Sequence, residues 1–290
     1  MTVATGIQWC DDTINPTMGC DGCELWQPER GTKVCYAGVD HERRAGHPGY
    51  APSFSHVSLF PGRTARIART RDLSGTTRLA KPWLDGLPRM IFVSDMSDAL
   101  SKDVPFAYLE AEIVGPATSG AGRRHRWLWL TKRPSRMAVF SNWLRERHVA
   151  WPENLWAGTS VTDARNTNRL EHLSRVGDEN TTRFVSLEPQ REWIDIEPWL
   201  NRLDWVIQGG QSGRAARPFE LEWARRTRGA CGRAVVAYFL KQLGRAPIDN
   251  GGSLRLRDPH GGDWVEWPAD LRVRQFPHST HASKPEEGPR

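Results

Sequence analysis

The sequence predicts an α/β protein built as a full or partial (β/α) barrel, with an N-terminal cysteine-rich metal-binding segment. Three observations support this prediction. Short apolar runs alternate with helix-like segments from residue 88 onward, which is typical of βαβ units. Polar side chains follow nearly every apolar run, and four of the five cysteines fall within the first 35 residues.

Six apolar runs are short enough to be buried strands. They span residues 89–94, 126–131, 155–161, 183–187, 204–208 and 234–240. Helix-like segments lie between them, at 104–115, 134–148, 163–176, 192–202 and 219–232. With one or two earlier strands, these runs fit a barrel. An open doubly wound sheet is the main alternative, although no GxGxxG follows any run, which weakens a dinucleotide-binding interpretation.

The chain divides into three parts. Residues 1–50 form the cysteine-rich segment, where turn signals such as Asn15-Pro16 and Asp21-Gly22 predict loops rather than regular elements. Residues 51–245 carry the barrel-like domain. Residues 246–290 are rich in Gly, Pro and His and form a C-terminal extension, whose last part we expect to be disordered.

The net charge of +6 favours polyanionic partners such as DNA or RNA. A genome of high GC content would enrich arginine equally, so charge alone does not decide. The first ten residues lack the basic and apolar regions of a secretory signal, and no apolar run is long enough to span a membrane. We therefore expect a cytoplasmic protein without a membrane partner, whose 14 tryptophans mostly pack in the core.

Polar residues at the ends of the predicted strands predict a binding or active site, because parallel strands present their carboxyl ends at one edge. The residues that follow the six runs are Ser94, Asp95, Ser97, Asp98, Thr131, Lys132, Arg133, Thr159, Ser160, Glu188, Gly209, Gly210, Gln211, Ser212, Gly213, Lys241 and Gln242. The glycines of the 209–213 loop suit either a close approach of a ligand to the backbone or a tight turn.

The cysteine spacing is C-x9-C-x2-C-x11-C, over Cys10, Cys20, Cys23 and Cys35. In a reducing compartment, clustered cysteines are more often metal ligands than disulfides, and the central C-x2-C is a strong ligand signature. Four thiolates would complete a structural zinc site. Three would leave one iron of a four-iron cluster open to S-adenosylmethionine. The spacing does not choose between the two.

Arginines also repeat in the segment 56–79. Arg63, Arg66 and Arg69 stand at i, i+3 and i+6, which places them along one side of a predicted helix. They suit either a track for a nucleic-acid backbone or a solvated helix face.

Several stretches together resemble the phage-associated three-cysteine-motif family of uncharacterised proteins, found in phages and bacteria. They are Ile7-Gln8-Trp9, Asn15-Pro16, Gly19-Cys20, Cys35-Tyr36-Ala37, IFVSDMSDAL (91–100), LTKRPSRM (130–137), LWAGTSV (155–161), RFVSLEP (183–189), DWVIQGGQSGRAARPF (204–219) and FLKQLG (239–244). The resemblance runs from about residue 7 to 245. That family is distantly similar to radical S-adenosylmethionine enzymes, which implies a (β/α) barrel, a [4Fe–4S] cluster and S-adenosylmethionine.

One departure from the family pattern concerns the ligands. Family members read Gly-Cys, a spacer and then Cys-x2-Cys-Tyr-Ala, but residue 32 here is Thr. Cys20 and Cys35 therefore match the family, whereas Cys23 depends on its C-x2-C spacing. Cys10 becomes a candidate substitute or fourth ligand.

Two functional hypotheses follow. In the first, an iron–sulfur enzyme acts on nucleic acid, in repair or modification, with Lys132, Asp95 and Asp98 as candidate catalytic residues. Ser160, Glu188 and the 209–213 loop would bind the cofactor, and Arg63, Arg66, Arg69, Arg133 and Lys241 would bind the nucleic acid. In the second, a four-thiolate zinc site merely ties down a nucleic-acid-binding protein. A third hypothesis, a metal-independent transferase or hydrolase, is not supported, because the sequence contains no nucleophile signature such as G-x-S-x-G.

Overall fold

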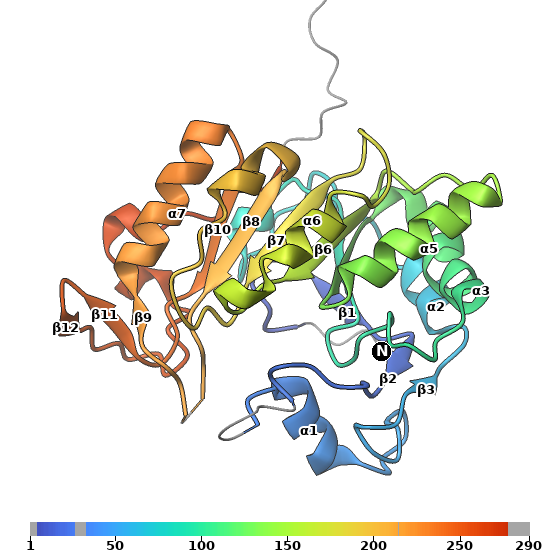
Figure 1. Cartoon of the computed structure of the whole chain (residues 1–290), viewed down its shortest axis with the longest axis horizontal. Coiled ribbons are helices and arrows are strands. Elements are labelled where there is room, and N and C mark those ends of the chain that lie inside the picture. The colour runs from blue at the N-terminus through green and yellow to red at the C-terminus, as the bar shows by residue number, and fades with distance from the viewer. Residues whose placement is uncertain (1–4, 27–32, 214, 278–290) are drawn as a thin grey trace, which may run out of the picture.

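The computed structural model describes residues 5–26, 33–213 and 215–277. Within these residues a parallel sheet with the order β1-β4-β5-β6-β7-β8-β10 forms the centre of the molecule (Figure 1). Its strands are Asp12–Ile14 (β1), Met90–Val93 (β4), Arg126–Thr131 (β5), Leu155–Ser160 (β6), Arg183–Leu187 (β7), Trp205–Gly209 (β8) and Ala237–Gln242 (β10). Each pairs in parallel with its neighbours in this order.

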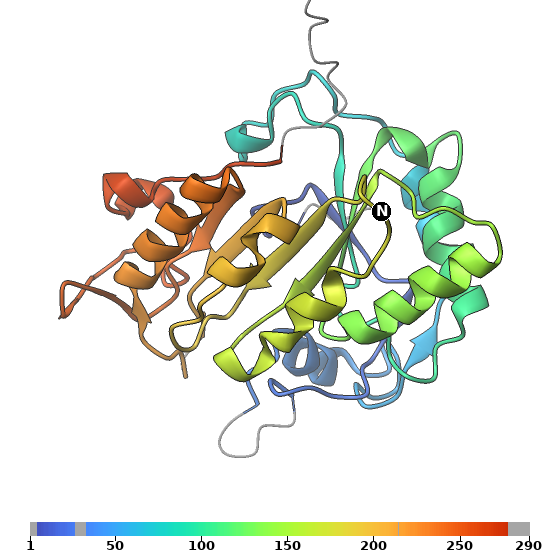
Figure 2. The same cartoon turned by 45° about the horizontal axis from the view of Figure 1, so that its top comes forward.

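The strand order confirms the α/β class and shows a curled half-barrel. Among the described strands, each new one is added on the same side of the previous one, whereas a doubly wound sheet reverses at a switch point. β1 and β10 are the outermost strands of this sheet and do not pair with each other. The predicted barrel is therefore partial, and helices flank the sheet (Figure 2).

Helices follow most of the strands, as the alternating pattern predicts. They are α1 (Tyr36–Arg44), α2 (Arg63–Ala68), α3 (Phe106–Leu109), the π-helical η2 (Glu110–Val114), α4 (Gly115–Thr118), α5 (Pro134–Glu146), α6 (Asn168–Leu173) and α7 (Leu221–Ala234). The 3₁₀ turns are η1 (Pro82–Leu84), η3 (Gly122–Arg124), η4 (Ala164–Asn166), η5 (Glu197–Arg202), η6 (Trp264–Glu266) and η7 (Ala269–Leu271). The helix predicted at 192–202 is reduced to η5, which begins where the Asp195 side chain accepts from Glu197 N at 3.0 Å.

The two faces of the sheet bury different sets of side chains. Alternation along β5 sends Trp127 and Trp129 to the helix-covered face, where Trp129 packs 5.7 Å from Phe140 of α5. The other face is lined by aromatics such as Phe92, and Trp9 lies over it with ring centroids 4.5 Å apart. Both arrangements agree with tryptophan as a packing residue.

The N-terminal part contains more regular structure than the turn signals predict. β1 joins the main sheet, β2 (Thr17–Met18) pairs with β3 (Ser58–Leu59), and α1 follows directly after Cys35. The prediction of loops alone was wrong there, because β1 obtains its backbone partners from β4, far along the chain.

The residues after 245 also pack against the main body. β11 (Pro247–Asp249) joins β9 (Phe219–Glu220) and β12 (Gly252–Ser253) in a small sheet. Farther on, residues 273–275 run beside β10, where Leu240 N donates to Val273 O at 2.9 Å. The segment 278–290, for which we expected disorder, lies outside the described residues. No described helix is both long and apolar enough to cross a membrane.

Candidate functional site

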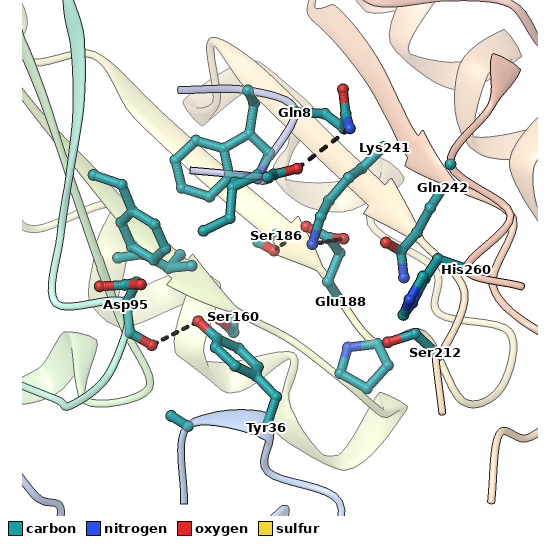
Figure 3. Close-up of a pocket in the computed structure, with 18 of the residues that line it drawn as sticks. Gln8, Tyr36, Asp95, Ser160, Ser186, Glu188, Ser212, Lys241, Gln242 and His260 are labelled. Carbon is teal, nitrogen blue, oxygen red and sulfur yellow. Dashed lines mark hydrogen bonds and ion pairs between the residues drawn. The ribbon is translucent and has the colours of Figure 1, made fainter. Parts of the chain in front are cut away.

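A cavity of about 1030 Å³ opens at the carboxyl edge of the sheet. Most of the predicted polar strand-end residues line it: Ser94, Asp95, Ser97, Asp98, Thr131, Lys132, Arg133, Ser160, Glu188, Gln211, Ser212, Lys241 and Gln242. Figure 3 shows Tyr36, the first residue of α1, donating to Asp95 O in one part of the cavity, and Glu188 paired with Lys241 in another. The fold therefore brings together groups such as Tyr36 and Lys241, which lie about 200 residues apart along the chain.

Cys20, Cys23 and Cys35 line the same cavity. They belong to one cluster with Trp26 and Phe54, beside the start of α1. Burial raises the pKa of the Cys20 thiol to about 11 and also raises the pKa of Cys35. Any metal that these sulfurs bind must therefore displace protons from them.

Backbone contacts hold the cysteines in this arrangement. Cys20 N donates to Phe54 O at 2.7 Å, and Cys35 N donates to Leu25 O at 3.1 Å. Gly19 has a positive φ of 88°, and a Cβ there would lie 2.0 Å from the carbonyl oxygen of His56. Only glycine fits this turn before Cys20, which explains the Gly-Cys pair.

Arg133 anchors the loop that carries Cys20 and Cys23. Its guanidinium pairs with Asp98 at 2.7 Å and with Asp21, and it donates to Gly22 O at 2.7 Å. One nitrogen also lies 3.8 Å from Cys20 Sγ. Arg133 therefore holds the cysteine loop in place. Its guanidinium, which we expected to bind nucleic acid, contacts Asp98, Asp21 and Gly22 of the protein itself.

Glu24 holds the other end of the same loop. Its two carboxylate oxygens accept from Arg169 at 3.0 and 2.9 Å, and Thr162 donates to one of them at 3.0 Å. Burial alone would raise the pKa of Glu24, but the hydrogen bond and charge of Arg169, helped by the charge of Lys132, lower it to about 2. Two ion-paired arginines therefore fix the loop on either side of Cys23.

Cys10 lies apart from the other three clustered cysteines. Its side chain is 0 % exposed and packs with Trp9 and Phe92 on the sheet face that the helices do not cover. Burial raises the pKa of its thiol well above the ordinary value. The structure does not bring Cys10 to Cys20, Cys23 and Cys35.

The donor set at the cavity consists of three thiols. Among the described residues, no group of three or more Cys, His, Asp or Glu side chains is arranged around a single metal ion. In a four-iron cluster each cysteine binds a different iron, so its sulfurs need not converge on one point. Three thiols that line one cavity fit such a cluster.

A polar part of the cavity wall is organised around Glu188. Lys241 Nζ pairs with its carboxylate at 3.0 Å, and Ser186 Oγ donates to it at 3.3 Å (Figure 3). Gly209 makes room for this carboxylate, because a Cβ at position 209 would lie 2.8 Å from Glu188 Oε1. Lys241 is therefore held inside the cavity.

The 209–213 loop contributes side chains rather than bare backbone to the cavity. Gln211 and Ser212 line it, whereas Gly210 packs against the backbone of Leu243 and Gly213 occupies a positive-φ turn. The glycines at 209 and 210 thus have packing reasons of their own.

The two candidate catalytic aspartates differ in their surroundings. Asp98 accepts hydrogen bonds from Thr131 Oγ1, Lys132 N and Arg133, so its carboxylate serves as an anchor. Asp95 lines the cavity, accepts from Asn15 Nδ2 at 2.5 Å, and has its pKa raised by burial. Of the two, Asp95 is better suited to exchange a proton.

The α2 arginines lie outside this cavity. Arg63 donates to Gly49 O at 2.8 Å and stacks 3.6 Å over the Phe60 ring, so it is part of the local packing. Arg66 and Arg69 are exposed, and their side chains make no hydrogen bond or ion pair to other described residues.

Sequence reasoning missed several residues of the site. Asp21, Glu24 and Arg169 carry no motif, although two of them flank a predicted ligand. The C-terminal residues His260, Trp264 and Arg274 also line the cavity. Nothing in the sequence pairs these residues with a cysteine more than 200 positions earlier.

Fold and site together define a half-barrel protein with a cysteine-lined cavity at its carboxyl edge. The chain belongs to the family described as "Protein of unknown function (DUF5131)", whose model matches residues 4–281. No curated protein and no solved structure matches the chain.

Proposed function

We propose that this chain is an iron–sulfur enzyme of the radical S-adenosylmethionine type. Cys20, Cys23 and Cys35 would bind the cluster, and the cavity would hold S-adenosylmethionine and the reacting part of the substrate. One observation carries the proposal: three cysteine thiols and the polar strand ends of a half-barrel share one cavity. When bound, the two cofactors would supply one-electron chemistry, with hydrogen abstraction from a substrate carbon.

The protein's own residues would position these groups. Arg133 and Arg169 would hold the loop of Cys20 and Cys23 against the sheet through their pairs with Asp21 and Glu24. Three thiolates, two on this loop and one at Cys35 just before α1, would leave one iron of the cluster without a protein ligand, which is the requirement for an exogenous one.

The polar wall around Glu188 would bind the polar parts of the cofactor. Glu188 suits an ammonium or hydroxyl group, and Lys241 beside it suits a carboxylate. Ser160, Gln211 and Ser212 add hydroxyl and amide groups on the same wall. Lys132, whose charge reaches Glu24, would neutralise an anionic substrate group, and Asp95 would exchange a proton.

The test is anaerobic purification followed by reconstitution with iron and sulfide. We expect a brown protein with near four irons per chain, an electron paramagnetic resonance signal on reduction, and release of 5′-deoxyadenosine from S-adenosylmethionine. A colourless protein that retains one zinc and rejects iron would overturn the proposal in favour of a zinc-stapled protein.

A further inference from the structure

Three consecutive loops at the carboxyl edge each carry an arginine. Arg165 lies in η4 after β6, Arg191 follows β7, and Arg217 follows β8. These strands are neighbours in the sheet, so their carboxyl-end loops adjoin. Ser160, Glu188 and Gln211, at or near the starts of the same loops, line the cavity, whereas the three arginines come later in each loop and are not among the lining residues.

The charges of Arg165 and Arg217 both repel Arg191, which lies between them in chain order. Arg191 lies within electrostatic range of Arg217 and Arg165, and burial followed by the charge of Arg217 lowers its pKa. Its Nε is buried, and the side chain has no hydrogen-bond partner among the described residues. Asp163 and Glu24 lie within electrostatic range, but neither forms an ion pair with Arg191.

Nearby acids are occupied by other partners. Both oxygens of Glu24 accept from Arg169, and Glu192 accepts from Ala164 N at 2.7 Å. Asp163 accepts from Asn166 at 2.9 Å and meets the 75 % exposed Arg165 at 3.7 Å, which is a weak pair. Arg217 is exposed and has no ion pair in the described part of the chain. The cluster therefore keeps its positive charge.

We propose that Arg165, Arg191 and Arg217 form a phosphate-binding rim that holds the backbone of a single-stranded nucleic acid beside the cavity. Arginine forks match phosphate oxygens in geometry and charge. Because the arginines lie outside the cavity rather than in it, the ligand must extend past the cavity mouth, which a polymer does. The role of this rim in substrate anchoring rests on the proposed enzyme function, but the binding itself does not require iron.

The chain offers a matched control on another surface. Arg66, Arg69 and Arg71 are exposed on and after α2, which packs on α4 and β1 at the opposite end of the sheet (Figure 1). Replacing either trio with glutamine removes the same charge. The comparison also tests the original assignment of the nucleic-acid contacts to α2.

The experiment measures fluorescence anisotropy of a labelled single-stranded DNA and of the matching RNA with the full chain, between about 50 and 200 mM salt. We expect the variant R165Q/R191Q/R217Q to lose at least tenfold in affinity at low salt. Its slope of log affinity against log salt should fall by about 2, because each single-strand phosphate contact contributes about 0.7. The R66Q/R69Q/R71Q variant should stay within twofold of the wild type.

Further arms separate the outcomes. Competition by adenosine monophosphate as strong as by the oligonucleotide would overturn the polymer assignment. Equal losses in both variants, or no loss in the rim variant, would overturn the rim itself. Circular dichroism checks folding, and iron content is measured on the same samples. Rim-dependent binding by a protein without iron would retain the rim and reject the proposed enzyme.

Discussion

The two edges of the parallel sheet use their charged residues differently. At the amino edge, Asp11 pairs with Arg78 at 2.8 Å and Asp12 pairs with Arg89, next to the backbone of the first strands. At the carboxyl edge, some charges anchor the cysteine loop, while Asp95, Glu188 and Lys241 face the cavity. Charge serves assembly at one edge and, in our proposal, chemistry at the other.

The largest effect is expected at the cysteines, which test whether the carboxyl edge holds a metal cluster. Cys20→Ala should reduce bound iron from near four per chain to almost none, because a cluster ligand is lost. Cys10→Ala should leave the iron unchanged, since Cys10 packs among aromatic rings away from the cavity. Iron assays after anaerobic reconstitution measure both variants. Iron loss in Cys10→Ala with retention in Cys20→Ala would reverse the ligand assignment.

The next test compares one arginine from the carboxyl edge with one from the amino edge. Arg89→Gln breaks one largely buried ion pair and should cost about 3 kcal/mol of unfolding free energy, whereas Arg133→Gln breaks the pairs with both Asp98 and Asp21 and should cost at least as much. Only Arg133→Gln should also weaken iron retention, because Arg133 holds the loop of Cys20. Urea unfolding and the rate of iron loss to a chelator give the two readouts. Equal iron loss in both variants would mean that stability alone governs cluster retention.

A smaller effect is expected at the polar wall. Lys241→Met should weaken binding of S-adenosylmethionine about tenfold, as for one lost charged hydrogen bond, and leave the iron content unchanged. Lys241 and Glu188 form a pair at 3.0 Å, so Glu188→Gln is the partner variant. Equilibrium dialysis against the labelled cofactor measures the change. Wild-type affinity in both variants would remove this pair from the cofactor site.

The smallest effect concerns the pH dependence of stability at the amino edge. His125 is fully buried before β5, its Nε2 lies 3.0 Å from Ala68 O, and burial lowers its pKa. The unfolded chain then binds more protons than the folded chain, so stability should fall as the pH drops below the ordinary histidine value of about 6.5. Melting temperatures between about pH 7.5 and about pH 5.5 should show this slope. His125→Asn should flatten it, and an unchanged slope would contradict the assignment.

Much of the fold was predictable because buried parallel strands leave a local pattern. The runs at 126–131 and 183–187 coincide with β5 and β7, since a strand covered on both faces must be apolar along its length. β1 escaped prediction, because three residues carry too short a pattern and their pairing with β4 is distant in sequence.

The last predicted strand shows how an end can shift. The run 234–240 is apolar throughout, but α7 continues through Ala234 and ends at Val235, which has a positive φ of 57°. β10 then begins at Ala237. Apolar character alone cannot separate the end of a buried helix from the start of a buried strand.

The order of residues along the chain was enough to predict the α/β class, the polar carboxyl edge and the grouping of Cys20, Cys23 and Cys35. Those features are local, because periodicity, strand-end chemistry and cysteine spacing are each read within a few residues. Which charges remain free depends on distant partners. Arg133 and Lys241 find carboxylates across the fold, Cys10 enters the core, and Arg191 and Arg217 make no ion pair with other described residues, because such pairings form only when the sheet curls.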